Sequence, residues 1–462
     1  MQCTVGLDDT DSLLGHCTTH LGFRAVGELL DRGCTFGKYP RLIRLNPNIP
    51  FKTRGNAAVC LEFETDDPEG AFGVVETILH RLSDVENGAN SGLVFMAGSF
   101  EPDFFRGLYL SAVSGLVSYR RVLSLLAERK VRHVTVGNGM GVVGAVASLG
   151  FSETDDHTYE IIGYRRQAAC GTKREIKDEP VVEMERRTFP HTFNSYDHRS
   201  RRVLVTPHGP DPVFLGIRAD SPGVALSALR MLGPEEELAG HMIYLSNQCT
   251  DAHLTSRLTL PMKAYASGWL DGSVEALERG EGGHLYIDLN AAGSVVRCAI
   301  YRPAADLQRA AGMLGRGDAV RVFGGVRRAT SRHPSILNVE KVEVLSLDPG
   351  QRSVNPTCAA CGRIAKSEGT GKGFQCRRCG AKFSEGARRT EDRTRSLVPG
   401  IYLPSSGSQR HLTKPLIRYG RELYEALPLI EGWFHPATSE ASSAPAKSPR
   451  SGHRSPLSPR TP

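Results

Sequence analysis

The sequence has few of the features that place a protein in a membrane or outside the cell. None of its apolar runs approaches the roughly 18 residues of a membrane span. Its first residues lack the basic start and apolar stretch of a secretory signal. Its 11 cysteines are an odd number and most are scattered singly, which does not suit a disulfide framework. We therefore expect a cytoplasmic protein with no membrane association.

Two common nucleotide-binding signatures are absent or incomplete. The P-loop pattern G-x-x-x-x-G-K-[ST] does not occur, which excludes a P-loop enzyme. Gly139, Gly141 and Gly144 match the dinucleotide pattern G-x-G-x-x-G, but the next predicted strand ends in Arg165 and Arg166, not in the acidic residue that binds a ribose. A nicotinamide site is therefore disfavoured. Two readings stay open: backbone N–H groups of this turn hold a nucleotide phosphate, or the glycines only allow close helix packing.

The most informative stretch that is present lies near the N-terminus. Asp8, Asp9 and Asp11 crowd into four positions after a predicted strand at 2–7. Such carboxylates repel one another unless a cation lies among them, and carboxylate oxygens are suitable ligands for Mg²⁺. No glutamate closes an EF-hand register. The alternative is a cluster that only forms a turn or a helix cap.

Hydroxyl and basic groups accompany these acids. Thr18 and Thr19 open a helix predicted over 17–31, and a helix N-terminus favours phosphate. Together with the acids, this arrangement predicts phosphoryl chemistry with ATP and Mg²⁺. Our candidate phosphate contacts precede a second strand or lie in the glycine-rich turn: Lys52, Arg54, Asn56, Gly137, Asn138, Gly139 and Gly141.

The predicted elements divide the chain into four structured parts and a tail. We expect an α/β unit over 1–150, a second α/β unit over 151–256 and a β-rich unit over 257–347. The five strands of the β-rich unit are expected near 258–268, 284–290, 294–301, 319–328 and 336–346. They fit a small oligonucleotide-binding (OB) barrel, with a β-sandwich as the alternative. Residues 348–436 follow, and 437–462 are a Ser/Pro/Ala/Arg low-complexity tail that we expect to be disordered.

The least ambiguous motif is a pair of C-x₂-C knuckles within 348–436. Its spacing is typical of a zinc ribbon, in which four thiolates close a structural site, and its ligands would be Cys358, Cys361, Cys376 and Cys379. Residues 352–395 contain 11 Lys/Arg and four Asp/Glu, and the whole chain has a net charge of +7. A basic ribbon beside a predicted barrel indicates nucleic-acid binding.

These features together predict an ATP-dependent enzyme that acts on RNA or DNA. A non-catalytic RNA-binding protein is one alternative, but it leaves the acidic loop without a role. A Mg²⁺-dependent nuclease or helicase-associated factor is another, and it would use the same carboxylates. No obligate protein partner is evident.

Several motifs, taken in order, resemble the archaeal tRNA 2-agmatinylcytidine synthetases. They are Gly6–Ser12 with Cys17–Thr19, Lys52–Asn56, Gly137–Gly139, Pro207–Pro212, Asn247–His253 and the zinc ribbon. The resemblance implies an α/β multidomain fold with a kinase-like domain (1–150), a ferredoxin-like domain (151–256), an OB-fold and a zinc ribbon. The family motif favours Gly where this chain has Cys249.

The resemblance also implies a reaction. The family uses ATP to join agmatine to C2 of the wobble cytidine in the CAU anticodon of an isoleucine tRNA, which then reads AUA. By similarity Asp8, Asp9 and Asp11 would hold Mg²⁺ on the ATP phosphates, and Thr18 matches the family's autophosphorylated threonine. The barrel and ribbon would bind the tRNA.

Overall fold

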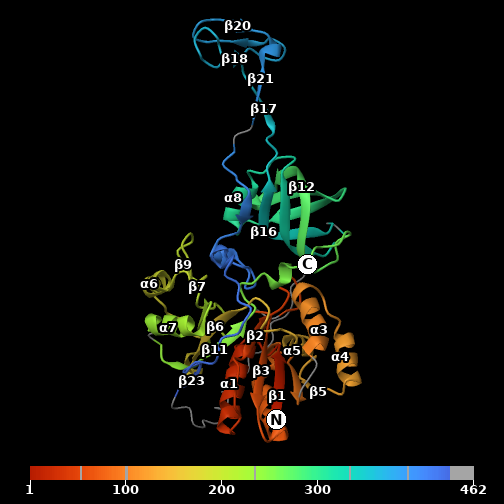
Figure 1. The fold of residues 1–462 in the computed structure, drawn as a ribbon, viewed down its shortest axis with the longest axis vertical. Helices are drawn as coiled ribbons and strands as arrows, with labels where there is room; N and C mark the ends of the chain where they lie inside the picture. The colour runs from red at the N-terminus through yellow and green to blue at the C-terminus, as the bar shows by residue number, and fades with distance from the viewer. Residues whose placement is uncertain (53–54, 99–101, 234–235, 332–333, 393–394, 438–462) are drawn as a thin grey trace, which may run out of the picture.

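The fold is taken from a computed structural model, which describes residues 1–437 with five short gaps (Figure 1). The gaps are 53–54, 99–101, 234–235, 332–333 and 393–394. Arg54, and all but the first residue of the 437–462 tail, therefore lie outside the described residues. In the part of the chain that is described, no helix combines the length and apolar character needed to cross a membrane.

One sheet of ten strands forms the base of the molecule. Its strand order is β5-β4-β1-β3-β2-β11-β6-β10-β7, and β23 pairs with β11 beside this path. The strands from the first unit are β1 (Gln2–Asp8), β2 (Arg41–Arg44), β3 (Ala57–Glu64), β4 (Gly92–Ala97) and β5 (Arg132–Thr135). The others are β6 (Thr158–Arg165), β7 (Thr192–Phe193), β10 (Val213–Ala219), β11 (Leu238–Ser246) and β23 (Phe434–Pro436).

The two α/β units are joined edge to edge in this sheet. β2 and β11 run parallel, with Arg41 opposite Leu245 and Leu42 opposite Ser246. Every other pair of the sheet, within the described residues, is antiparallel. In an open sheet of parallel strands, ligands bind at the loops that follow the carboxyl ends of the strands. That rule applies to parallel strands, and β1 is antiparallel to both of its neighbours.

Helices cover the first unit's half of the sheet on both faces. Buried side chains of α1 (Thr18–Asp31) and α2 (Pro68–Leu82) share one core with β1, β3 and β4. On the other face, α5 (Val142–Leu149) packs with α3 (Pro102–Ser114) and α4 (Tyr119–Glu128). A Cβ atom at Gly6 would lie 2.1 Å from the Ala145 carbonyl oxygen, so the glycine in β1 lets α5 approach the strand. This close approach brings α5 to the end of β1.

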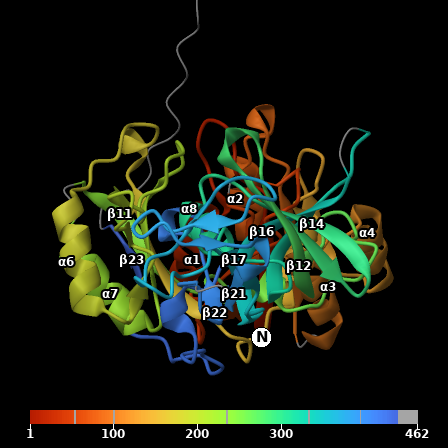
Figure 2. The same ribbon diagram turned by 90° about the horizontal axis from the view of Figure 1, so that it is seen from above.

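The second unit extends the same sheet with its own helices. α6 (Asp178–Thr188) and α7 (Pro222–Leu232) pack together, and the short hairpin β8 (Tyr196–Asp197) and β9 (Arg202–Val203) stands beside them. Figure 2 shows α6 and α7 at one side of the molecule, and α3 and α4 at the opposite side. The α6–α7 pair and the α3–α4 pair therefore lie at opposite sides of the molecule, with α1 and α2 between them (Figure 2).

The β-rich unit is a sheet that closes on itself. Its strand order is β14-β13-β12-β15-β16-β22, and a parallel β14–β16 pairing closes the ring. Its elements are β12 (Ser267–Arg279), β13 (Leu285–Ala291), β14 (Ser294–Ile300), α8 (Ala305–Ala311), β15 (Ala319–Arg327), β16 (Ile336–Ser346) and β22 (Gly400–Tyr402). The unit is therefore a closed barrel and not a sandwich. Four of the five strands expected from the sequence occur in their expected ranges.

The first expected strand, 258–268, was wrong, because β12 begins only at Ser267. Pro261 has no N–H group to donate to a ladder, so the preceding segment does not form a strand there. β12 carries a register shift between Val274 and Ala276. A bulge of this kind interrupts the alternation of apolar and polar residues, which hides the strand in the sequence.

The zinc ribbon projects from the barrel on a two-stranded stalk (Figure 1). The stalk pairs β17 (Gln351–Val354) with β21 (Arg389–Asp392), and a small sheet of β18 (Lys366–Ser367), β19 (Phe374–Gln375) and β20 (Lys382–Phe383) lies at its end. The chain then returns through β22 in the barrel, crosses the second unit and pairs with β11 as β23. This returning segment, residues 400–436, contacts all three larger units.

Candidate active site

The acidic loop follows β1 directly and is fixed by hydrogen bonds. Asp9 has a positive φ of 59°, and its backbone N–H donates to Asp8 Oδ1 at 2.7 Å. The N–H of Asn90 and the Oγ of Ser91 both donate to the Asp9 carbonyl, at 3.0 and 3.2 Å. The turn therefore holds the carboxyl groups of Asp8 and Asp9 close together at the end of the strand.

This proximity makes the carboxyl groups difficult to ionise. Asp8 is only 7% exposed, and burial, with the nearby charges of Asp9 and Asp11, raises its pKa well above the ordinary value. Burial and the charge of Asp11 raise the pKa of Asp9 to about 7. A cation among these oxygens would reverse both effects. Carboxylate oxygens are the donor type that Mg²⁺ prefers, so these residues match the predicted metal in their chemistry. Their oxygen atoms do not converge to metal-ligand spacing here, since the four ribbon cysteines are the only such cluster among the described residues.

The N-terminal end of α5 lies against the acidic loop because of two glycines. A Cβ at Gly144 would lie 1.8 Å from Asp8 Oδ2, and one at Gly141 would lie 2.8 Å from the Cβ of Asp9. Any larger side chain would displace the acids. Close packing is therefore one reason for these two glycines, and the sequence had left that alternative open.

The first three residues of the glycine-rich stretch, 137–139, form a turn behind the acidic loop. Gly137 and Gly139 have positive φ values of 67° and 71°, which favour glycine. The N–H of Asn138 donates to Asn90 Oδ1 at 3.1 Å. These three residues form the turn that leads into α5, and they do not line either cavity described below.

A small cavity of about 80 Å³ lies on one side of the acidic loop. We call it the aspartate cavity, and its lining includes Asp8, Asp9, Lys52, Asn56, Gly141 and Gly144. Burial, with the nearby Arg410, lowers the pKa of Lys52. Half of the ten predicted magnesium and phosphate contacts are therefore brought together here, namely Asp8, Asp9, Lys52, Asn56 and Gly141.

A larger cavity of about 520 Å³ lies on the other side. We call it the threonine cavity, because Thr18 and Thr19 line it together with Asp11 and Cys17. Its opposite wall carries several charged or ionisable side chains: Arg44, Glu160, Arg202, Asp211, Arg218, Arg410 and His411. The loop from Asp8 to Thr18 thus separates two cavities and contributes side chains to both.

Thr18 is the first residue of α1 and is almost fully buried, with 3% exposure. Its backbone N–H donates to Asp11 Oδ1 at 3.2 Å. The backbone N–H and the hydroxyl of Thr10 donate to its Oγ1 at 3.3 and 3.2 Å. The residue before the helix, Cys17, provides no side-chain cap. Asp11 therefore caps α1 from the acidic loop and ties the threonine to the carboxylates.

Two tyrosines of the second unit hold the same turn from the opposite side. The hydroxyls of Tyr164 in β6 and Tyr244 in β11 donate to the Thr19 carbonyl at 3.0 and 2.7 Å. The two hydroxyls also lie 2.7 Å from each other, in an apolar core. The start of α1 is thus positioned jointly by both α/β units.

We expect the double variant Tyr164→Phe, Tyr244→Phe to be less stable than the wild type by about 1–3 kcal/mol, because each buried hydrogen bond contributes about 1 kcal/mol. Urea denaturation followed by fluorescence measures this difference. The matched control is Tyr424→Phe, since Tyr424 is 61% exposed. A double variant as stable as the control would mean that the hydroxyls do not hold the turn.

A chain of hydrogen bonds supports the far wall of the threonine cavity. Arg218 Nε donates to Gln248 Oε1 at 3.2 Å, and Gln248 Nε2 donates to Glu160. The guanidinium of Arg44 lies 3.8 Å from Glu160. Arg218 also donates to Nδ1 of His411 at 3.2 Å.

His411 is the most unusual group of this wall. Arg44, burial and Arg218 lower its pKa well below the ordinary value. Its imidazole is therefore neutral, and because Nδ1 accepts from Arg218, Nε2 carries the proton. Sequence reasoning missed this residue along with Arg44 and Arg218. The only signals were a basic residue at the end of one predicted strand and a cluster of charge near residue 410.

The Asn247–His253 segment is mainly a structural junction. Asn247 bonds both backbone groups of Arg44, at 2.8 and 2.9 Å. Asp251 and His253 contact Lys341 and Glu340 of β16 at 2.5 and 3.0 Å. From the sequence, a turn cluster and a ligand pocket are equally favoured for this segment. Its side chains instead connect the second unit to the first unit and to the barrel.

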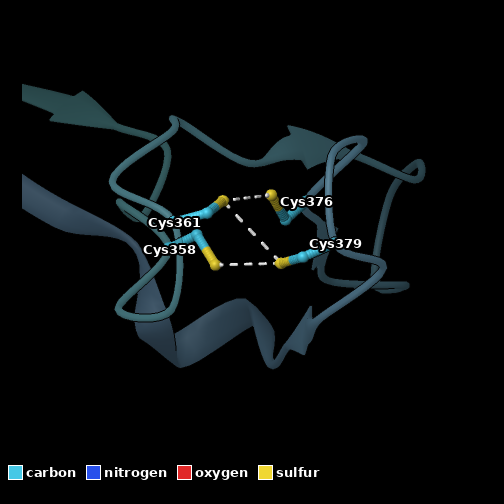
Figure 3. Close-up of side chains that lie close together, drawn as sticks. All are labelled: Cys358, Cys361, Cys376 and Cys379. Carbon is cyan, nitrogen blue, oxygen red and sulfur yellow. Dashed lines mark hydrogen bonds between the residues drawn. The ribbon is translucent and has the colours of Figure 1, made fainter.

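The four cysteines of the ribbon converge on one point (Figure 3). The sulfur atoms of Cys358 and Cys379 lie 3.4 Å apart, as do those of Cys361 and Cys376. All four Sγ atoms lie within 4.8 Å of one another. Four thiolates at this spacing fit a closed, structural Zn²⁺ site. The predicted zinc ligands are therefore brought together as expected.

Comparisons with known proteins match nearly the whole described chain. Family models described as the TiaS TCKD domain, the TiaS FLD domain and the TiaS C-terminal zinc ribbon domain match residues 4–76, 139–253 and 355–395. A tRNA 2-agmatinylcytidine synthetase TiaS from Cenarchaeum symbiosum (strain A) is 42% identical over 420 residues, which cover 90% of this chain and 93% of that protein.

Solved structures give the same answer. A complex of TiaS with an isoleucine tRNA and ATP has a TM-score of 0.79 and 32% identity, covering 94% of this chain and 99% of that chain. A complex of TiaS with an isoleucine tRNA, AMPCPP and agmatine has a TM-score of 0.77 and 30% identity, covering 90% of this chain and 97% of that chain. The chain therefore belongs to the TiaS family of tRNA 2-agmatinylcytidine synthetases.

Proposed function

We propose that this protein uses ATP to join agmatine to C2 of the wobble cytidine in the CAU anticodon of an isoleucine tRNA. The observation that carries this proposal is the loop from Asp8 to Thr18, which places carboxylates in one cavity and a threonine at the start of a helix in the other. Solved relatives are complexes with an isoleucine tRNA, with ATP or its analogue AMPCPP, and with agmatine.

The reaction needs an activated leaving group. The C2 oxygen of cytosine leaves poorly, and transfer of a phosphoryl group from ATP to that oxygen makes it a phosphate. The primary amine of agmatine then attacks C2, the C–O bond to the phosphate breaks, and the amine loses a proton. ATP thus supplies the free energy, and phosphate departs with the former C2 oxygen.

The acidic loop would place the phosphates of ATP. Asp8, Asp9 and Asp11 would hold Mg²⁺, which neutralises phosphate charge and orients the phosphoryl group. Lys52, Asn56 and the backbone at Gly141 lie around the same cavity and are proposed phosphate contacts. Arg54 is proposed by similarity only. Gly137, Asn138 and Gly139 shape the turn behind the cavity.

Thr18 is proposed as the residue that accepts a phosphoryl group during autophosphorylation. It lies at the N-terminus of α1, where the helix dipole favours negative charge, and its own N–H is bonded to Asp11 Oδ1. The threonine cavity around it has room for a pyrimidine ring or the agmatine chain. We propose Glu160, an acid that lines this cavity, as a contact for a cationic substrate.

We assign domain roles in the same way. Residues 1–150 would be the kinase-like domain, 151–256 the ferredoxin-like domain and 257–347 an OB-fold. Residues 348–436 contain the zinc ribbon and the returning C-terminal segment. The barrel and the ribbon would bind the tRNA, because the ribbon is basic and neither of them, within the described residues, contributes a lining residue to the two cavities.

The decisive experiment is mass spectrometry of the isoleucine tRNA after incubation with the protein, ATP, Mg²⁺ and agmatine. We expect a mass increase on the wobble cytidine that equals agmatine minus water, and no increase when ATP or agmatine is omitted. Binding without modification or ATP consumption would favour a non-catalytic RNA-binding protein. Cleaved RNA, indifferent to agmatine, would favour a nuclease.

The zinc site gives a separate prediction. Cys376→Ser should remove the bound zinc and unfold the ribbon, because a structural zinc site supplies the folding free energy of so small a domain. We expect the tRNA affinity to fall about tenfold, as measured by filter binding, while ATP-dependent phosphorylation of the protein persists. Zinc content is measured by atomic emission.

The matched control is Cys170→Ser, since Cys170 is a free cysteine that lies in the second unit and outside the ribbon. It should keep both zinc and tRNA affinity. Unchanged tRNA affinity in a zinc-free Cys376→Ser protein would show that the ribbon does not contribute to tRNA binding.

A further inference from the structure

We propose that a basic cavity beside the threonine cavity binds a phosphodiester group of the RNA strand next to the target cytidine. We call it the hairpin cavity, because the β8–β9 hairpin forms one of its walls. Its volume is about 630 Å³, and its charged or ionisable lining residues are Lys173, Arg174, Asp178, Arg201, Arg202 and His208. The inference rests on the proposed function, since it assigns part of the tRNA contact surface.

Positive charge is in excess in this cavity. The Arg174 guanidinium is occupied in building the cavity wall, since it donates to the carbonyls of Val213, Gly209 and Asp211 at 2.6–2.7 Å. Asp178 accepts a hydrogen bond from Tyr196 at 3.0 Å. The remaining cations therefore outnumber the single acid and determine the sign of the field.

Two of these cations are not engaged by other side chains. Lys173 and Arg201 are exposed, and neither side chain forms an ion pair or hydrogen bond within the described residues. Arg202 is held near the cavity by a hydrogen bond from its guanidinium to the Gly407 carbonyl, at 3.2 Å. Unpaired cations around a concave surface favour an anionic ligand.

The position of the cavity identifies the source of the anion. Residues Arg202 and 206–209 line both the hairpin cavity and the threonine cavity. A nucleotide whose base enters the threonine cavity remains joined to phosphodiester groups on both sides. One of them would therefore lie near the shared wall, within reach of the free cations.

The hairpin also faces the barrel. Arg199, at the turn of the hairpin, forms an ion pair with Asp306 of α8, and Ser408 donates to the Pro303 carbonyl at 2.8 Å. The hairpin stands at the end of the second unit nearer the barrel (Figure 1). An RNA strand that leads from the barrel to the threonine cavity would pass this basic surface.

The triphosphate of ATP is the competing source of a phosphate, and the structure disfavours it. Of the acids that would hold its metal, Asp8 and Asp9 line the aspartate cavity and Asp11 lines the threonine cavity, and none of them lines the hairpin cavity. Phosphate contacts to RNA backbones are made by exposed Lys and Arg side chains such as those present here.

The test is the double variant Lys173→Gln, Arg201→Gln in the full-length protein. We expect the tRNA dissociation constant to rise about 3- to 30-fold, and the slope of log affinity against log salt to decrease by about 1 to 2, because each neutralised phosphate contributes about 0.7–0.9 to that slope. In steady-state modification assays, KM for tRNA should rise while kcat and KM for ATP stay near wild type.

The matched control is Arg120→Gln, Arg121→Gln, which removes two exposed cations from α4 on the opposite side of the molecule (Figure 2). If Lys173→Gln, Arg201→Gln kept the wild-type tRNA affinity and the wild-type salt slope, the inference would be overturned. A rise in KM for ATP alone would also overturn it, since the phosphate would then be that of ATP. If the wild type bound tRNA without modifying it, while the variant still lost affinity and slope, the proposed function would fail and the RNA contact would stand.

Discussion

Asp9→Asn should reduce tRNA modification at least about a hundredfold, while the affinity for tRNA stays near wild type. Asparagine keeps the shape of the side chain but removes the negative charge that a divalent cation requires. Losses of this size are typical when a group that stabilises phosphoryl transfer is removed. The measurement is the rate of agmatine incorporation at saturating ATP, combined with a filter-binding assay for tRNA.

The same substitution should make the metal-free protein more stable. The pKa of Asp9 rises from the ordinary 3.8 to about 7 on folding, so the folded wild type binds more protons than the unfolded chain between these values. Its stability therefore falls as the pH rises through this window. The introduced asparagine does not titrate, so in EDTA the variant should gain stability relative to the wild type as the pH rises toward 7.

Asp31→Asn, an exposed acid at the end of α1, is the control for both measurements and should resemble the wild type. Full activity of Asp9→Asn would refute the role of Asp9 in holding the cation. A pH-independent stability difference would refute the account of the clustered carboxylates.

Thr18→Ala should also abolish modification, and should remove ATP-dependent labelling of the protein at this position. Alanine lacks the hydroxyl that would accept the phosphoryl group, and also the Oγ1 that accepts the two hydrogen bonds from Thr10. Incubation with γ-labelled ATP, followed by peptide mapping, measures the labelling. We expect the tRNA affinity to change by less than about twofold.

Thr18→Ser separates these two effects, because it restores a hydroxyl in the same place. We expect it to recover labelling and most of the activity. Thr77→Ala, in α2, removes a threonine hydroxyl that donates to the Gly73 carbonyl within its own helix, and it should behave as the wild type. A fully active Thr18→Ala protein would exclude the proposed phosphoryl acceptor.

Local motifs of the site were predictable from the sequence because neighbouring residues define them. The acids follow β1, Thr18 opens α1, and the cysteine knuckles need only the correct spacing to form the ribbon. Of the four phosphate contacts predicted in the glycine-rich stretch, one lies at the aspartate cavity and three do not. Gly141 lines the aspartate cavity, whereas Gly137–Gly139 form the turn behind it.

The far wall of the threonine cavity could not be predicted, because it depends on contacts between distant parts of the chain. Arg44, Glu160, Arg218 and His411 come from both α/β units and from the returning segment. They meet only because β2 pairs with β11. This parallel pairing joins only two residues of each strand, so neither strand carries a sequence pattern from which the pairing could be predicted.

Some elements were missed for local reasons. The helix α6 contains few apolar residues, since only Val181, Met184 and Thr188 are buried. It therefore lacks the broad apolar stripe on which a helix prediction depends. The helix α3, Pro102–Ser114, was also not predicted; it contains Gly107, which lowers helix propensity.

Cys249 shows how a backbone constraint explains a departure from a family motif. Its φ is 58°, in the left-handed region that glycine adopts without strain. Its backbone N–H donates to the His411 carbonyl at 2.8 Å. The fold thus keeps the glycine-like conformation here although the residue is cysteine, and this junction can form without the family's glycine.

The path of the returning segment sets an order for the assembly of the protein on the ribosome. Arg410 and His411 belong to the threonine cavity, and β23 pairs with β11, yet all are synthesised after the barrel and the ribbon. A nascent chain that ends at residue 347 would contain every proposed magnesium and ATP-phosphate contact, but its threonine cavity would lack the wall formed by Arg410 and His411. The cavity around Thr18 is therefore complete only after Arg410 and His411 have been synthesised.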